Sequence, residues 1–86
     1  MSAPLNLTNR FELLLTNNPA SLPYVLNQFA QANISPTAVN AVSQGDSYLA
    51  VSVTVKHMCE EAARNLQQTL KAVPAVKLAR LEHLVI

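Results

Sequence analysis

Apolar and polar residues alternate along this chain with two different periods. A period of two residues, which is typical of strands, occurs over residues 9–16, 34–43, 48–55 and 76–85. A spacing of three or four residues, which marks one face of a helix, occurs from Leu22 to about Ala32 and from about residue 58 to 72. The predicted order is therefore strand, helix, strand, strand, helix, strand.

Turn-forming residues separate the predicted elements. The segment Asn17-Asn18-Pro19-Ala20-Ser21 opens the first helix, because Asn is a good N-cap and Pro is tolerated in a first turn. Asn33 is predicted to take a left-handed conformation and to end this helix. Pro36 falls early in the strand predicted over 34–43, which favours an edge position because proline cannot donate to a ladder. Gly45, the only glycine, marks the hairpin turn at 44–47.

This order of elements predicts an α+β fold, the βαββαβ arrangement of a ferredoxin-like sandwich. The right-handed crossover rule selects a four-stranded antiparallel sheet in the order 4-1-3-2, with two helices on one face. At 86 residues the chain is predicted to form a single domain over 1–86, with its core at about 9–86.

The composition indicates a partner chain. Half of the residues are hydrophobic and only 13% are charged, which is low for the surface of a monomer. A domain of this size buries roughly 60% of its unfolded surface, so burial against a second chain would add stability. We expect a homodimer in which the edge strands 34–43 pair, giving one eight-stranded sheet with the two first helices side by side.

Charge and cysteine content exclude several classes of protein. The net charge of +1 without a basic stripe argues against nucleic-acid binding.

No apolar run is long enough to span a membrane, and the N-terminus lacks the pattern of a signal peptide, so a cytoplasmic protein is expected. One cysteine and two histidines allow neither an internal disulfide nor a cysteine-rich zinc site, and no metal or cofactor is predicted.

No catalytic constellation stands out in the sequence. His57 and His83 fall on different elements, and we expect structural or exposed roles for both. Cys59 falls at the start of the second helix, where a thiol can be activated. It also falls on the apolar stripe of that helix, which predicts burial, together with Ala62, Ala63, Leu66 and Leu70. We therefore expect a protein without catalytic residues of its own. A small enzyme that uses Cys59 is a further, weaker hypothesis.

The loop 16–25 and the element order together resemble the ACT domain, a small-molecule-sensing module that regulates amino-acid metabolism. Leu22, Val25 and Phe29 match the first helix of that family in register. The resemblance covers about residues 9–86. It is closest to the regulatory small subunits of acetolactate (acetohydroxyacid) synthase in their short single-domain form, with further support from residues 11–17 and 65–76.

The resemblance implies a regulatory subunit that binds the thiamine-dependent catalytic subunit of acetolactate synthase and activates or tunes it in branched-chain amino-acid biosynthesis. The alternative is a free-standing ACT sensor that binds an amino acid as a dimer without an enzyme partner.

The resemblance also implies an effector site in the loop after the first strand, where helix N–H groups suit the α-carboxylate of a branched-chain amino acid such as valine. Its residues would be Asn17, Asn18, Pro19, Ala20 and Ser21. The family usually has glycine at the position of Ala20. The other interpretation of the loop is that its two asparagines simply cap the helix.

Overall fold

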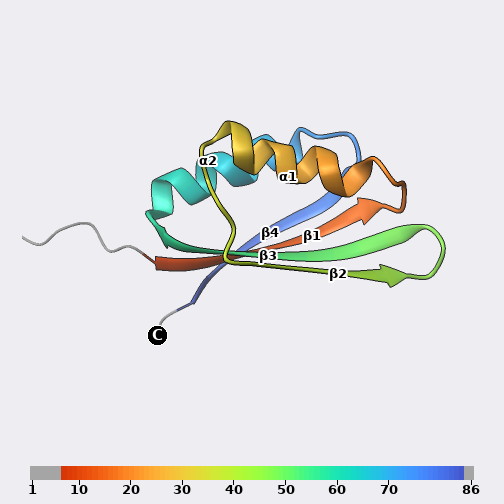
Figure 1. The fold of residues 1–86 in the computed structure, drawn as a ribbon, viewed down its shortest axis with the longest axis horizontal. Helices are drawn as coiled ribbons and strands as arrows, with labels where there is room; N and C mark the ends of the chain where they lie inside the picture. The colour runs from red at the N-terminus through yellow and green to blue at the C-terminus, as the bar shows by residue number, and fades with distance from the viewer. Residues whose placement is uncertain (1–6, 85–86) are drawn as a thin grey trace, which may run out of the picture.

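The computed structural model describes residues 7–84, and both helices lie across the same face of its antiparallel sheet (Figure 1). The elements are β1 (Leu7–Thr16), α1 (Ser21–Gln31), β2 (Ala38–Gln44), β3 (Tyr48–Met58), α2 (Glu60–Lys71) and β4 (Val76–Leu84). The strand order β2-β3-β1-β4 is the predicted order 4-1-3-2 counted from the other edge, so the predicted βαββαβ fold is confirmed.

The hydrophobic core lies between the two central strands and the helices. Strand β1 pairs with β3 on one side and with β4 on the other, and its period of two places Phe11, Leu13 and Leu15 under the helices. Phe29 of α1 meets Phe11 edge to face, with ring centroids 5.4 Å apart. The remaining core side chains come from both helices, β3, β4 and the connection after α2, and they are Val25, Val51, Val53, Val55, Met58, Ala63, Leu66, Leu70, Val73, Val76 and Ala79.

The edge position of β2 is confirmed, but its predicted start was wrong. The strand begins at Ala38, and the preceding residues from Ile34 to Thr37 form the connection from α1. Asn33 has a φ of 60°, which confirms the left-handed end of the helix. Pro36 therefore lies before the strand, and proline's missing donor is not what places β2 at the edge.

The junction between β3 and α2 also differs from the sequence prediction. The strand continues to Met58, which is buried, and His57 takes a left-handed φ of 59° just before it. Cys59 becomes the N-cap of α2 and is only partly buried, while Ala62 is exposed. The prediction that both lie on the apolar stripe was wrong, because the helix turns a narrower face to the sheet. Its buried residues are Ala63, Leu66 and Leu70.

A buried polar group holds the strand ends together. Asn9 is completely buried, and its Nδ2 donates to the backbone oxygen of Met58 at 3.0 Å. Because the amide nitrogen is the donor there, Oδ1 must accept from Nδ1 of His83, 2.6 Å away. Nε2 of His83 in turn lies 3.4 Å from Oε1 of Glu60. These contacts tie β1 to the ends of β3 and β4 and to the first turn of α2.

Neither helix within residues 7–84 has the length and apolar character needed to cross a membrane.

We predict that Asn9→Leu destabilises the protein by about 1–3 kcal/mol, because the buried oxygen of Met58 loses its donor and His83 loses its acceptor. Urea unfolding followed by circular dichroism measures the change. The matched control is Asn65→Leu at an exposed position of α2, for which a change within about 0.5 kcal/mol is expected. Equal effects of the two substitutions would contradict this role for Asn9.

We predict that Cys59→Ser stabilises the protein by about 0.5–1 kcal/mol. The residue has the extended backbone of an N-cap (φ −74°, ψ 157°) but makes no side-chain cap hydrogen bond, which a serine hydroxyl would supply. Thermal unfolding of Cys59→Ser and of Cys59→Ala as the control tests this. A lower melting temperature for the serine variant than for the alanine variant would show that the thiol position is apolar instead.

Candidate functional site

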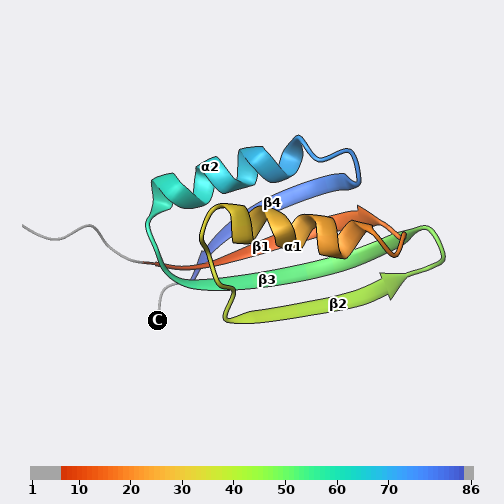
Figure 2. The same ribbon diagram turned by 45° about the horizontal axis from the view of Figure 1, so that its top comes forward.

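The predicted effector loop connects β1 to α1 at the end of the sheet where the β2–β3 hairpin and the α2–β4 connection also lie (Figure 2). Backbone hydrogen bonds fix this arrangement: the N–H of Asn17 donates to the oxygen of Ser47 at 3.0 Å, and that of Thr16 donates to the oxygen of Ala75 at 2.9 Å. The loop is therefore held between two other connections rather than standing free in solvent.

A hollow of about 480 Å³ lies beside this loop. Three of the five predicted site residues line it, namely Asn18, Ala20 and Ser21, whereas Asn17 and Pro19 do not. The remaining lining residues are Thr16 and Tyr24 and, from the α2–β4 connection, Val73, Pro74 and Ala75. Tyr24 was not among the predicted site residues. Its position on the polar side of the helix could have indicated a binding role, because an aromatic side chain there is left exposed, and Tyr24 is 55% exposed. The residues from the α2–β4 connection could only be found from the fold.

Most N–H groups at the start of α1 are already used. Oδ1 of Asn18 accepts from the N–H of Ala20 at 2.9 Å, and the backbone oxygen of Asn18 accepts from Ser21 at 2.9 Å. Pro23 has no N–H. Of the backbone N–H groups in the first turn of α1, that of Leu22 is left to bind a ligand. Asn18 forms an Asx turn just before the helix, but the N-cap residue is Ala20 and no side chain caps the helix. In the first turn a carboxylate would meet one free backbone N–H rather than several.

Ala20 does not strain the loop. Its backbone lies in the right-handed helical region, with φ −85° and ψ −14°, which any residue adopts. Glycine at this position would therefore not be needed for backbone freedom. Since Ala20 lines the hollow, its methyl group acts only by occupying ligand space.

Around this loop the surface carries no charge over a long stretch of sequence. Residues 13–45 contain no Asp, Glu, Lys, Arg or His, and they include all of α1 and all of β2. Strand β2 is exposed along its whole length, and its valines Val39 and Val42 are 41% and 64% exposed. Strand β2 lies on the side of α1 that faces away from α2 and β4 (Figure 2). We call this neutral area the α1–β2 surface.

Side chains that could take part in catalysis or bind a metal do not assemble into a site. Within residues 7–84, no three His, Cys, Asp or Glu side chains lie close enough together to hold a metal ion. His83 contacts Asn9 and Glu60, whereas His57 and Cys59 line a separate shallow hollow at the β3–α2 junction.

Comparisons with known proteins agree with this architecture. A model of the ACT-like domain matches residues 3–85. No curated protein matches the chain in sequence. Among solved structures, the C-terminal domain of the MgtC protein from Mycobacterium tuberculosis matches with a TM-score of 0.75 at 12% identity, over 96% of this chain and 93% of that domain. At this identity the likeness shows the fold alone, while the domain model covers nearly the whole sequence: the chain belongs to the ACT-like domain family.

Proposed function

We propose that this chain is a regulatory module without chemistry of its own, which works as a homodimer through the α1–β2 surface. The observation that carries the proposal is that this surface is uncharged, exposed and built around an open strand edge. An edge strand presents unpaired N–H and C=O groups, which proteins otherwise shield or pair. In a two-fold arrangement, β2 of one protomer would pair with β2 of the other, and the two α1 helices would lie side by side.

The opposite edge of the sheet is poorly suited to the same role. The side chain of Gln67 on α2 donates to the backbone oxygen of Ala79 on β4 at 3.0 Å, so that edge is partly occupied. Lys77 and Arg80 also stand on β4, and charged residues at an edge oppose pairing with an identical strand. These features favour β2 as the edge for self-association.

We further propose that the partner of this dimer is the catalytic subunit of acetolactate synthase, which the chain would bind and activate or tune. This assignment is supported by the resemblance at Leu22, Val25 and Phe29 and by membership of the ACT-like family. The alternative is a free-standing amino-acid sensor that acts as the dimer alone. The same α1–β2 surface supports that alternative, because it requires only a second copy of the chain.

Mixing experiments distinguish the two functions. We expect the purified chain to co-elute with the thiamine-dependent catalytic subunit from the same organism and to change its rate of acetolactate formation. The matched control is the catalytic subunit with an equal concentration of an unrelated small protein. A stable dimer that neither co-elutes nor changes the rate would favour the free-standing sensor.

We predict that Val39→Asp weakens the dimer by tenfold or more. A carboxylate on β2 would lose water on pairing without gaining a partner there, and a cost of about 1.4 kcal/mol corresponds to a factor of ten. Sedimentation equilibrium measures the constant. Leu78→Asp, at a similarly exposed position on β4, is the control and should leave the dimer unchanged. A monomeric native chain at high micromolar concentration would overturn the proposed assembly.

We predict weak or absent binding of valine, leucine and isoleucine to the isolated chain, because the loop offers a carboxylate few free N–H groups. Ala20→Gly should strengthen whatever binding exists by enlarging the hollow, whereas Asn17→Ala, which lies outside the hollow, should not change it. Calorimetric titration tests these expectations. Micromolar affinity in the native chain would show that the effector site is intact despite Ala20 and the hydrogen bond between Asn18 and the N–H of Ala20.

A further inference from the structure

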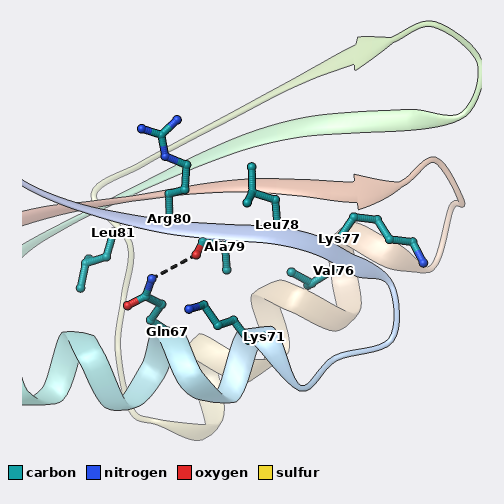
Figure 3. Close-up of a pocket in the computed structure, with 8 residues that line it drawn as sticks. All are labelled: Gln67, Lys71, Val76, Lys77, Leu78, Ala79, Arg80 and Leu81. Carbon is teal, nitrogen blue, oxygen red and sulfur yellow. Dashed lines mark hydrogen bonds between the residues drawn. The ribbon is translucent and has the colours of Figure 1, made fainter.

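The outer edge of β4 borders a second hollow, of about 530 Å³, between that strand and α2 (Figure 3). Gln67 and Lys71 of α2 line it, together with residues 76–81 of β4. The α1–β2 surface is uncharged, whereas the charged side chains that line this hollow are all positive.

Three of the six Lys and Arg residues of the chain stand at this edge: Lys71, Lys77 and Arg80. No carboxylate is among the lining residues. In the described part of the chain, Arg10 pairs with Glu12 and Glu82, and Arg64 pairs with Glu60, but none of the three forms an ion pair. Lys71 and Lys77 are thus the positive charges of this edge without a carboxylate in the hollow, whereas Arg80 shares its face of the sheet with Glu12, its register partner on β1, and with Glu82.

The directions of these side chains limit what they can bind together. Lys71 extends from α2 into the hollow on the helix side, while Arg80 projects from β4 to the opposite face of the sheet, as Leu78 does (Figure 3). A single small anion cannot contact both. An extended chain that lies along the edge can, because its successive side chains point alternately to the two faces of the sheet.

The backbone of β4 is also oriented for such a partner. The oxygen of Ala79 points outward, away from β1, since it accepts from Nε2 of Gln67 at 3.0 Å. Backbone groups alternate in direction along a strand, so Leu81 turns its N–H and C=O to the same edge. Gln67 is half-buried, and an incoming strand would replace its hydrogen bond by an equivalent backbone one.

We propose that the outer edge of β4 is a docking site for an extended acidic segment of a partner protein, which adds to the sheet as a fifth strand. Backbone pairing would supply the register, and acidic side chains on the helix side would meet Lys71. On the other face an acidic side chain would compete with Glu12 and Glu82 for Arg80. A second copy of this chain is a poor occupant, because it would bring the same three positive charges to the edge. The site lies at the edge of the sheet opposite to β2, so binding there does not depend on the proposed dimer.

The probe for this site is a fluorescein-labelled peptide, Val-Glu-Glu-Val-Glu-Glu-Val, which places acids on both faces of a strand. Fluorescence anisotropy at low ionic strength should show saturable binding that weakens with added salt. Lys71→Ala and Arg80→Ala should each weaken binding roughly two- to fivefold, which is the range for exposed ion pairs. Lys56→Ala, an exposed lysine on β3 outside the hollow, is the matched control and should leave binding unchanged. Amide chemical shifts should change at residues 77–83 and not along β2.

Several results would overturn the proposal. If the same peptide with Gln in place of Glu binds equally well, charge is not what recognises it. If Lys56→Ala weakens binding as much as Lys71→Ala, the attraction is diffuse. Displacement by inorganic phosphate beyond that by chloride at equal ionic strength would indicate a small-anion site, and stronger binding of a single-stranded oligonucleotide would indicate a nucleic-acid site. Absence of peptide binding at millimolar concentration would mean that the cations only protect the edge from aggregation.

Discussion

The structure depends on the burial of β1 as the central strand. Its helix-facing side chains Phe11, Leu13 and Leu15 lie beneath both helices, and the edge-to-face contact of Phe11 with Phe29 joins α1 to the sheet. Strand β1 is paired on both sides, with β3 and with β4, apart from irregularities between Leu7 and Asn9 and between Leu14 and Leu15. The two edges that remain, β2 and β4, are the places where the sheet can meet other molecules.

These two edges have opposite chemistry. Strand β2 belongs to a surface without charge and is exposed along its length, whereas β4 is bordered by Lys71, Lys77 and Arg80 and is partly covered by Gln67. A neutral open edge suits pairing with an identical copy, since no like charges are brought together. A cationic edge opposes such pairing and suits an acidic partner of a different kind. The two proposals together give this small domain two neighbours, one at each edge of the sheet.

The fold was predictable from the sequence because its pattern is locally consistent. The alternation in β1 and β3 and the spacing of Val25 and Phe29 each specify an element without reference to the rest of the chain. Predictions were wrong where contacts between segments distant in sequence determine the bounds of an element. The chain from Ile34 to Thr37 was included in the predicted strand but forms a connection, and Cys59 is the N-cap of α2 because β3 continues to Met58. The hollow beside the effector loop was predicted only in part, since Val73, Pro74 and Ala75 are distant in sequence from the loop. The sequence also left open whether the asparagines bind an effector or bond to the start of the helix, and in the structure Asn18 accepts from the N–H of Ala20.

The central claim is that the α1–β2 surface joins two copies of the chain, and hydrogen exchange of the β2 backbone tests it most directly. In an isolated protomer, amides on the outer edge of a strand exchange quickly, whereas pairing across a two-fold axis would protect alternate residues between Ala38 and Gln44. The account predicts that these amides exchange slowly at high protein concentration and faster on dilution, while the amides of β1 stay protected at both. Fast exchange of the outer β2 amides at every concentration would contradict it.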